Sequence, residues 1–387
     1  MKKNRILTAL ILIISNILVG VTVFAVTMMF AVPKRTDKLA QLKHLIMTRY
    51  VGEYDETELE DGAAVGMLAA TGDRWSYYIP ASQYEALMQS QSNSDYVGVG
   101  ISIVYEEAGT RIVSVVSNGP ANEAGVLPDD LIVAVDGTNV VGKTTDEVAA
   151  LVQGAANTKV KLTLKRGEDT LEITVTRRAI AVIVAEGKML EGNIGLVTIN
   201  NFNDKCAQET IAAIDALVEQ GAKGLVFDVR GNPGGRVDQL TKVLDHLLPK
   251  GEIFHSVETG GKDEYSYSDD KCIQLPMAVI VNGDSYSAAE FFAAALSEYD
   301  WATVVGEQTV GKSYFQYTYR LYDGSAVALS SGKYFTPKGV SLAEVGGLTP
   351  DIPLELTAEQ RKLFNYGRLE PMEDPQILAA IESLGLS

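Results

Sequence analysis

The order of apolar and polar positions divides the chain into stretches of different character. Residues 6–32 form an apolar run of 27 residues without a charge, and apolar positions then recur at helical spacing up to residue 88. Residues 97–176 contain short runs rich in β-branched side chains, which are typical of strands. After residue 178, strand-like and helix-like segments alternate, as they do in an α/β core. We therefore expect an α+β multidomain fold with one N-terminal transmembrane helix, a small helical subdomain, a β-rich domain and an α/β core.

The same pattern predicts individual elements. Helices are expected at residues 57–70 and 81–88, and the polar stretch 89–95 is interpreted as a linker because it has no apolar period. Thr144 and Glu147 form a capping-box signal ahead of a further helix. The remaining predicted elements are strands at 97–104, 111–116, 131–135, 160–165, 170–176, 194–199, 224–229, 277–281, 303–305 and 314–319, and helices at 204–220, through 240–248, at 288–296 and at 375–384.

The apolar run at residues 6–32 is long enough to cross a membrane. At the rise of an α-helix it would extend about 40 Å, whereas the hydrocarbon core is roughly 30 Å thick. Three basic residues precede it (Lys2, Lys3 and Arg5), which predicts a cytoplasmic N-terminus, although further basic residues follow the run. It exceeds the apolar region of about 7 to 15 residues in a signal peptide, which favours an uncleaved anchor over a cleaved leader. We expect a single-pass protein of the cell membrane in which everything after residue 32 is extracytoplasmic.

Charge and composition narrow the classes of partner. The chain has 50 acidic and 33 basic residues, and its net charge of -17 argues against nucleic acid as a partner because phosphate would be repelled. Two cysteines, Cys206 and Cys272, are too few for a disulfide framework and are interpreted as core residues, with a single disulfide left open. The three histidines have no metal-ligand spacing, so no metal site is predicted.

A serine is predicted to lie where a strand turns into a helix. The apolar run 277–281 leads through Asn282 to Ser285 and Ser287, which precede a run of helix formers. That position places a hydroxyl beside unpaired backbone N–H groups and the positive end of the helix dipole, which would stabilise an oxyanion. On spacing alone, the commoner interpretation is that the two serines only cap the helix.

Two further segments supply candidate chemistry. Lys312 has apolar and aromatic neighbours, and a lysine acts as a general base only when desolvation lowers its pKa. A Gly-Lys pair in a loop is, however, usually just solvated. The sequence DVRGNPGG at residues 228–235 follows a predicted strand, and its three glycines allow backbone N–H groups to converge on an anion. It is interpreted either as part of an oxyanion hole or as a glycine-rich turn.

The segments DVRGNPGG, VNGDSYSAAE and GKSYFQ occur in this order and together resemble the three signature segments of the C-terminal processing, or tail-specific, serine peptidases. The resemblance implies that Ser287 is the nucleophile and that Lys312, 25 positions later, is its general base, whereas Ser285 would give 27. It also implies that Gln316 holds the lysine, that the N–H groups of Gly234 and Ala288 form the oxyanion hole, and that no cofactor is needed.

Parts of the chain depart from the resemblance or complicate it. The family usually has alanine and serine where this chain has Tyr286 and Ala289, and it commonly has glycine where this chain has Ser313. Tyr286, beside the nucleophile, is predicted to narrow the site or to alter substrate preference. If residues 314–319 form a strand, residues four apart lie roughly 13 Å from each other. Direct contact between Gln316 and Lys312 would then require a bend.

The β-rich stretch resembles the PDZ domain of the same family, through YVGVG near its start and GPANEAGVLPDDLIVAVDG later. The resemblance implies a carboxylate site at the N–H groups of Gly98, Val99 and Gly100, and a strand at 101–104 that pairs with the apolar C-terminus of a protein or peptide substrate. The apolar stripe of the following helix would either wall this groove or belong to the core of the module. This stripe consists of Val148, Leu151 and Val152.

These inferences give a domain plan and three functional hypotheses. The predicted parts are a cytoplasmic N-terminus and anchor at 1–35, a helical subdomain at 36–92, a PDZ domain at 93–178, a peptidase core at 179–357 and a helical tail at 358–387. The tail helix is expected to pack on the core or on a second subunit, and a homodimer is implied by the resemblance only. The main hypothesis is a membrane-anchored serine endopeptidase. The alternatives are a catalytically silent PDZ scaffold and a gated signalling protease with one dedicated substrate.

Overall fold

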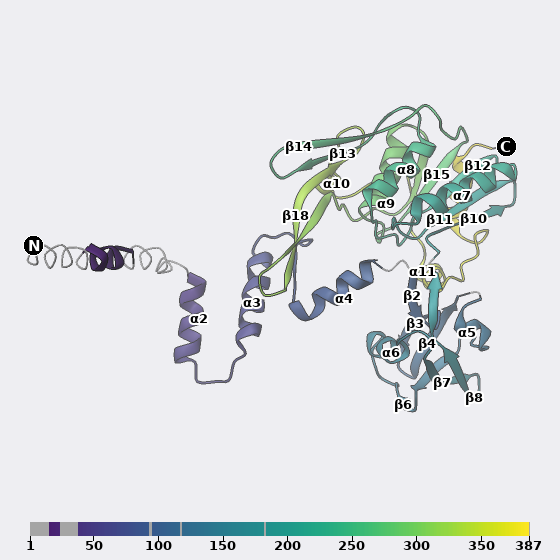
Figure 1. The fold of residues 1–387 in the computed structure, drawn as a ribbon. Helices are drawn as coiled ribbons and strands as arrows, with labels where there is room; N and C mark the ends of the chain where they lie inside the picture. Colours follow the sequence, from purple (N-terminus) through teal and green to yellow (C-terminus); the bar gives the residue numbers. More distant parts are fainter. Residues whose placement is uncertain (1–14, 24–37, 93–94, 117, 182, 387) are drawn as a thin grey trace, which may run out of the picture. The chain divides into compact units, whose positions relative to one another are not determined.

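The computed structural model describes residues 15–23, 38–92, 95–116, 118–181 and 183–386. These residues fall into two compact units, one up to Pro80 and one from Ala81 onward (Figure 1). Most of the predicted membrane segment 6–32 lies outside the described residues, and the described part, 15–23, is helical. Within the described ranges, no helix has both the length and the apolar character needed to cross a bilayer.

Besides the helical residues 15–23, the described part of the first unit contains two helices and a short strand. These are α2 (Lys38–Arg49), α3 (Glu56–Ala69) and β1 (Tyr77–Ile79), so the helix predicted at 57–70 is confirmed. The side chain of Asp55 caps α3 by accepting the N–H of Glu58 at 3.0 Å. Lys43 of α2 forms an ion pair with Glu56 of α3 at 2.6 Å, which holds the two helices together.

The second unit begins with α4 and the β-rich module. α4 (Ala81–Ser92) continues through four residues of the stretch that was predicted to be a linker. The predicted strand at 97–104 is interrupted, because Gly100 has a φ of +79° and separates β2 from β3. The other elements of the module are β2 (Asp95–Gly98), β3 (Ile101–Glu106), β4 (Gly109–Val115), α5 (Pro120–Glu123), β5 (Leu131–Val135), β6 (Thr138–Asn139), α6 (Thr145–Val152), β7 (Lys159–Arg166), β8 (Asp169–Thr176) and β9 (Arg178–Ala181).

The module is built around one antiparallel sheet of order β3-β4-β5-β7-β8, and β2 pairs separately with β9. The capping box predicted at the start of α6 is present, with Thr144 and Glu147 as its members. Val148 and Val152 of α6 are buried in the core of the module, and Leu151 packs against the same cluster. The apolar stripe of α6 is therefore core, which answers the alternative left open by the sequence.

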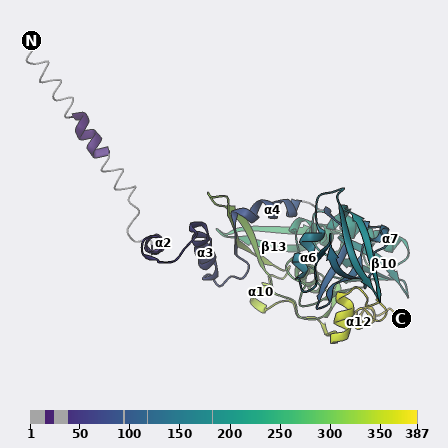
Figure 2. The ribbon, with the colours of Figure 1, turned by 90° about the horizontal axis from the view of Figure 1, so that it is seen from below.

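The α/β core contains a six-stranded sheet of order β10-β11-β12-β15-β16-β19, in which only β10 is antiparallel to its neighbour. Its alternating side chains form two apolar layers, one packed against α7, α8 and α9 and the other against α12 (Figures 1 and 2). The bounds are β10 (Ala185–Leu190), β11 (Ile194–Ile199), α7 (Cys206–Glu219), β12 (Gly224–Asp228), α8 (Val237–Leu247), β15 (Met277–Val281), α9 (Ala288–Glu298), β16 (Ala302–Gly306), β19 (Ile352–Pro353) and α12 (Pro375–Ser383).

A second sheet of the core was only partly predicted. Of its strands, the sequence pattern indicated only β17 (Tyr314–Arg320), which pairs with β18 (Ala326–Phe335). β18 also pairs with β13 (Gly251–Glu258), and β13 pairs with β14 (Lys262–Ser268). Aromatic contacts join this sheet to α9, because Phe254 and Tyr334 both lie edge-on to Phe291.

The C-terminal segment packs on the core of its own chain. It comprises α10 (Leu342–Val345), α11 (Ala358–Asn365) and α12. Ile377, Ala380 and Leu384 of α12 are buried against the sheet, whereas Leu378 remains exposed. The predicted apolar face of the tail helix is therefore used mainly within the chain.

Both cysteines are free thiols. Cys206 is buried at the start of α7, and Cys272 is partly buried in the loop after β14. Burial raises the pKa of the Cys206 thiol to about 11, so it is protonated at neutral pH. The interpretation of the cysteines as core residues holds for Cys206, and the disulfide left open by the sequence is not formed.

Candidate active site

Three loops meet at one edge of the six-stranded sheet. β12, β15 and β16 are parallel neighbours, so the loops that follow them emerge side by side at their carboxyl ends. These loops are residues 229–236, 282–287 and 307–313, and each contains one of the sequence motifs. The topology of the sheet therefore brings together three segments that are far apart in the sequence.

Ser287 lies in a strained turn at the start of α9. Its φ of 58° and ψ of -126° are unfavourable for a residue with a side chain and cost about 1 to 3 kcal/mol. Ser287 is 8% exposed, and it caps α9 through a capping box with Glu290, whose side chain accepts the N–H of Ser287 at 2.8 Å. The surrounding structure therefore holds this serine in a conformation that it would not adopt by itself. The capping interpretation therefore holds for Ser287, but capping alone does not require its positive φ, because an N-cap residue usually has extended backbone angles.

Ser285 has a different role from Ser287. Its hydroxyl donates to the carbonyl oxygen of Val229 at 2.8 Å and accepts the N–H of Asn282 at 3.0 Å. Ser285 is fully buried, and these bonds join the turn before α9 to the loop after β12. Its hydroxyl is thus committed to structure.

Glu290 connects the serine turn to the lysine loop. The carboxylate is fully buried and accepts the N–H of Ser287 at 2.8 Å, that of Gly311 at 2.7 Å and that of Lys312 at 2.8 Å. It also accepts the hydroxyl of Thr309. Burial raises the pKa of Glu290, and its hydrogen bonds to the ionised form act in the opposite direction.

Lys312 is half-buried beside the serine turn. Its Nζ lies 6.0 Å from the centre of the Tyr286 ring, a distance at which a cation and a ring face still attract each other. The structure therefore brings the side chain of Lys312 next to the residue that precedes Ser287. The predicted effect of Tyr286 on substrate preference stays a prediction.

Gln316 lies on β17, four residues after Lys312. Its Nε2 donates to the carbonyl oxygen of Tyr314 and to the Oγ of Ser330, both at 3.1 Å. The pairing of β17 with β18 shifts register between Phe315 and Gln316. The strand thus has an irregularity at the place where contact with Lys312 would require a bend.

Gly234 packs directly against the serine turn. It has a φ of +88°, and a methyl group at this position would lie 2.8 Å from Cβ of Ser287, from the nitrogen of Ala288 and from the carbonyl oxygen of Tyr286. Only glycine fits both the backbone conformation and the space. The structure therefore brings together the two residues that were predicted to form the oxyanion hole.

The N–H groups of these two residues differ in their partners. The Gly234 N–H donates to Oδ1 of Asn232 at 2.8 Å, and the other end of that amide donates to the carbonyl oxygen of Ile199 at 2.7 Å. Ala288 is the first residue of α9, where N–H groups have no helical acceptor. Among the described residues, the Ala288 N–H makes no hydrogen bond to the protein.

A buried ionic cluster supports the glycine-rich loop from the other side. The guanidinium of Arg230 pairs with Asp228 at 2.6 Å and with Asp374 at 2.7 Å, and it donates to Gln376 at 2.8 Å. Phe364 stacks on it at 4.3 Å. Burial opposes the charge of Arg230, but the two carboxylates outweigh it and raise the pKa of the guanidinium.

Sequence reasoning did not identify three of these residues. Glu290, Asn232 and Arg230 all lie within or beside the quoted motifs, so their positions were visible. The one available signal was the position of Glu290 three residues after Ser287, since a glutamate there accepts the N–H of the N-cap residue. The bonds of Glu290 to the lysine loop depend on the tertiary fold and have no local pattern.

The candidate carboxylate site of the β-rich module lies between β2 and β3. Gly98 pairs with Arg178 of β9, and the carbonyl oxygen of Val99 accepts the N–H of Ala121 at 2.8 Å. β3 ends the order of the described module sheet, so one of its edges has no described neighbour. An extended peptide could pair with that edge.

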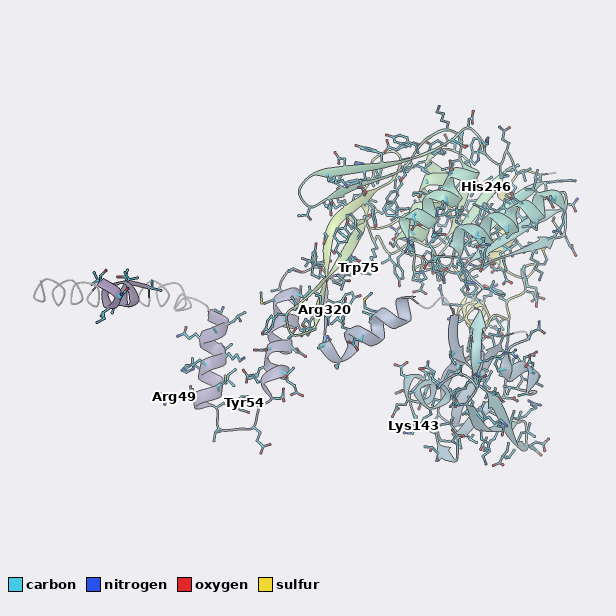
Figure 3. All side chains as sticks on the ribbon, in the orientation of Figure 1. Arg49, Tyr54, Trp75, Lys143, His246 and Arg320 are labelled. Atoms are coloured by element: carbon cyan, nitrogen blue, oxygen red, sulfur yellow. The ribbon has the colours of Figure 1, made fainter. Side chains whose placement is uncertain are left out.

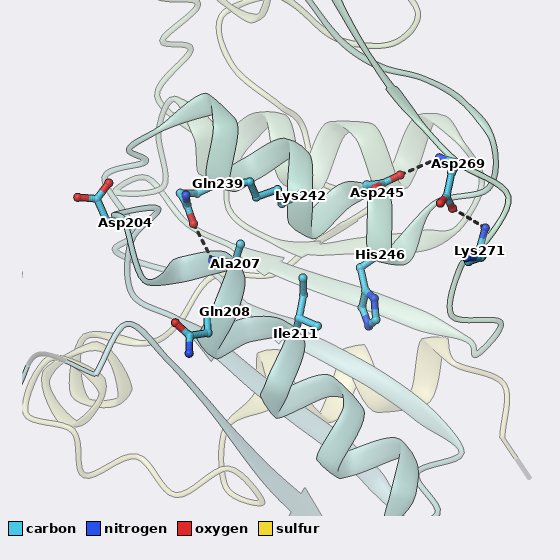
Figure 4. A pocket seen from close by; sticks show the side chains of 10 residues that line it. All are labelled: Asp204, Ala207, Gln208, Ile211, Gln239, Lys242, Asp245, His246, Asp269 and Lys271. Atoms are coloured by element: carbon cyan, nitrogen blue, oxygen red, sulfur yellow. Dashed lines mark hydrogen bonds between the residues drawn. The ribbon is translucent and has the colours of Figure 1, made fainter.

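A cavity of about 560 Å³ lies apart from the three loops, between α7 and α8 (Figure 4). Side chains such as Ile211, Lys242 and His246 line it, and His246, which is labelled in Figure 3, belongs to α8. None of the candidate catalytic residues lines this cavity. It is therefore not the candidate active site.

Comparisons with known proteins agree with this architecture. Residues 193–354 match the model of peptidase family S41, and residues 111–166 match a PDZ domain model. The carboxy-terminal processing protease CtpA of Bacillus subtilis is 34% identical over 323 residues, covering 83% of this chain and 69% of the relative. A probable CtpA-like serine protease of Staphylococcus aureus (strain COL) is 30% identical, covering 82% of this chain and 64%, just under two thirds, of the relative.

Solved structures show the same fold. The photosystem II D1 C-terminal processing protease has a TM-score of 0.51 and 28% identity, covering 82% of this chain and 86% of its own. A putative S41 protease from Bacteroides fragilis has a TM-score of 0.57 at 17% identity, covering 82% of this chain and 87% of its own, which is a likeness of fold alone. From the sequence identity and the coverage, the chain belongs to the carboxy-terminal processing serine peptidases of family S41, with a PDZ domain ahead of its peptidase core.

Proposed function

We propose that the chain is a membrane-anchored, extracytoplasmic serine endopeptidase in which Ser287 is the nucleophile and Lys312 its general base. One observation carries the proposal: the N–H groups of Ser287 and Lys312 each donate to the same oxygen, Oε2 of Glu290, at 2.8 Å. Two residues 25 positions apart are thereby fixed to one buried group. A strained serine and a half-buried lysine on adjoining loops support a serine–lysine mechanism, in which the two side chains come within hydrogen-bond reach.

In the proposed reaction, the neutral amine of Lys312 accepts the proton of the Ser287 hydroxyl as Oγ attacks the carbonyl carbon of the substrate. The N–H groups of Ala288 and Gly234 stabilise the negative charge on the carbonyl oxygen. The protonated lysine then gives its proton to the leaving amine, and water releases the acyl group by the reverse transfers. Gln316 orients the lysine, and the reaction uses no cofactor.

The PDZ module is proposed to capture the C-terminus of the protein substrate. The N–H groups of Gly98, Val99 and Gly100 would hold the terminal carboxylate, and an extended, apolar C-terminal segment would pair with the open edge of β3. Because α6 contributes its apolar stripe to the core, specificity is assigned to the turn and to β3 rather than to that stripe.

One observation favours a gated form of this enzyme as a second candidate. The Gly234 N–H is engaged by the side chain of Asn232 at 2.8 Å, so it has to turn away from that acceptor before it can bind an oxyanion. A substrate or a partner that reorganises the loop would then switch the enzyme on.

The test is cleavage of an unfolded protein with an apolar C-terminus by the full-length chain in detergent. Ser287→Ala and Lys312→Ala are each expected to lower kcat/KM by about 10⁴-fold or more, because they remove the nucleophile or its base. Amidation of the substrate C-terminus is expected to raise KM of the parent about tenfold, which corresponds to about 1.4 kcal/mol of lost binding.

The control is Lys333→Ala, since the side chain of Lys333 is 44% exposed and has only weak contacts, with Glu344 and with the ring of Tyr314, among the described residues. This variant should cleave like the parent. Activity that survives in Ser287→Ala would contradict the proposed nucleophile. A parent that binds C-terminal peptides but does not cleave would support the silent scaffold.

The membrane anchor is proposed from the sequence of residues 6–32. The full-length chain is expected to stay in the membrane fraction during extraction at alkaline pH, and a variant that lacks residues 1–35 is expected to be released. Release of the intact full-length chain under the same conditions would argue against an anchor.

A further inference from the structure

Among the described residues, Glu290 is the buried carboxylate that touches both segments of the proposed catalytic pair, and the reaction steps above assign it no role. It lies in the first turn of α9 (Figure 1), three residues after Ser287. We propose that Glu290 is a positioning residue that, as an ionised carboxylate, sets the register of Ser287 against Lys312. This inference rests on the proposed function of those two residues.

The number of hydrogen-bond donors around Glu290 matches an ionised carboxylate. A carboxylate has about four acceptor sites, and Glu290 receives four donors: the N–H groups of Ser287, Gly311 and Lys312 and the hydroxyl of Thr309. A protonated acid would point its own O–H at one of these donors. The donor set therefore fits the charged form and not the neutral one.

The two carboxylate oxygens of Glu290 accept from different donors. Oε2 accepts from Ser287 and Lys312, whereas Oε1 accepts from Thr309 and Gly311. One oxygen is thus shared between the two catalytic segments, and the other anchors the lysine loop. A rotation of the carboxylate would move both segments at once.

The hydroxyl of Thr309 is itself held in a fixed direction. Its hydroxyl donates to Glu290 and accepts the N–H of Leu348 at 2.8 Å, so it has a defined direction. The carboxylate is held in place by the fold and does not depend on substrate. This is the preorganisation that positioning requires.

Because Glu290 is buried, the proposal predicts in which direction the free energy of unfolding changes with pH. The groups that face the carboxylate are the four donors, and the titratable side chains on the loops 282–287 and 307–313 are those of Asp284, Tyr286, Glu307 and Lys312. Because burial raises the pKa of Glu290, folding favours its neutral form. The stability gained in this way is fully present below the unfolded pKa of about 4.3 and is lost as pH rises through the folded pKa.

The ionised form that positioning requires is thus the form that costs stability. The free energy of unfolding of the parent, minus that of Glu290→Gln, is therefore expected to fall as pH rises through the folded pKa of Glu290. Urea titrations at a series of pH values measure this difference. The fall is expected to end below the pH of the activity assay, and a difference that is still falling at that pH would show a neutral Glu290 and overturn the assignment of a charged carboxylate.

The kinetic test uses Glu290→Gln in the full-length chain, with Glu298→Gln as the matched control. Glu298 lies at the other end of α9 and also accepts one threonine hydroxyl, from Thr336, and one backbone N–H, from Lys338. Glu290→Gln puts an amide N–H₂ against backbone N–H donors and is expected to lower kcat about 100-fold or more, with KM within about threefold of the parent. Glu298→Gln is expected to keep kcat within about threefold.

A second pair of variants keeps the test decisive if Glu290→Gln does not fold. Thr309→Val removes one donor and is expected to lower kcat about tenfold, whereas Thr309→Ser keeps the hydroxyl and is expected to restore it. Full kcat in Glu290→Gln overturns the inference, and full kcat in Thr309→Val overturns it if Glu290→Gln does not fold. If Ser287→Ala also stays active, the proposed nucleophile itself is wrong; if only Ser287→Ala is inactive, the failure belongs to Glu290 alone.

Discussion

Replacing Gly234 with alanine is expected to lower kcat by about 100- to 1000-fold, the range seen when an oxyanion donor is lost. The new methyl group would lie 2.8 Å from Cβ of Ser287 and from the nitrogen of Ala288, so the loop and the serine turn would have to separate. The change acts on the geometry of the reacting groups and leaves the PDZ module untouched. Steady-state kinetics with an unfolded protein substrate measure the effect.

Gly231→Ala is the matched control because it lies in the same loop and also has a positive φ, of 67°. A methyl group there meets nothing within 4 Å, so only the conformational cost of about 1 kcal/mol applies. This variant should lose some stability but keep kcat within about threefold. Equal losses of kcat in both variants would show that general loop strain, and not the contact with Ser287, is responsible.

Arg230→Ala is expected to lower the free energy of unfolding by about 3 to 5 kcal/mol, because it leaves two buried carboxylates without their partner. Asp228 and Asp374 both pair with this guanidinium, and Asp374 also caps α12 by accepting the N–H of Gln376 at 2.9 Å. The variant therefore loosens the glycine-rich loop and the C-terminal helix together. Urea unfolding of the full-length chain measures the change.

Arg236→Ala is the control for a charge removed from the same loop. Arg236 is exposed and pairs at the surface with Asp204 and Asp238, where ion pairs contribute about 0 to 1 kcal/mol. We expect its stability to stay within about 1 kcal/mol of the parent. A loss below about 1 kcal/mol in Arg230→Ala as well would contradict the view that the buried cluster fixes the loop.

The sequence predicted the parts of this fold whose pattern is local. The strands β11 and β15 begin and end at the predicted residues, because each is a continuous apolar run between turn residues. The capping box at Thr144 was also correct, since it needs only two residues at a fixed spacing. The turn at Ser287 was predicted because the apolar run 277–281 ends at Asn282 and a run of helix formers begins after Ser287.

The rest depends on contacts that no local pattern contains. β13, β14 and β18 are half-exposed strands with mixed polar and aromatic residues, and they are defined by pairing with one another. The same holds for the site. Glu290 and Lys312 are 22 positions apart, and only the parallel pairing of β15 with β16 brings their loops together. The engaged Gly234 N–H could likewise be seen only once Asn232 was placed.

The central claim is that Ser287 is the nucleophile and that Lys312 activates it. The most direct measurement is covalent labelling of the full-length chain with a fluorophosphonate, which forms a bond to an activated serine oxygen, followed by mass spectrometry of the modified peptide. We predict a single label on Ser287 that is absent in Ser287→Ala and at least about 100-fold slower in Lys312→Ala, since removing a general base costs about 10²- to 10⁴-fold. A label on Ser285, or a labelling rate that does not change in Lys312→Ala, would contradict the account.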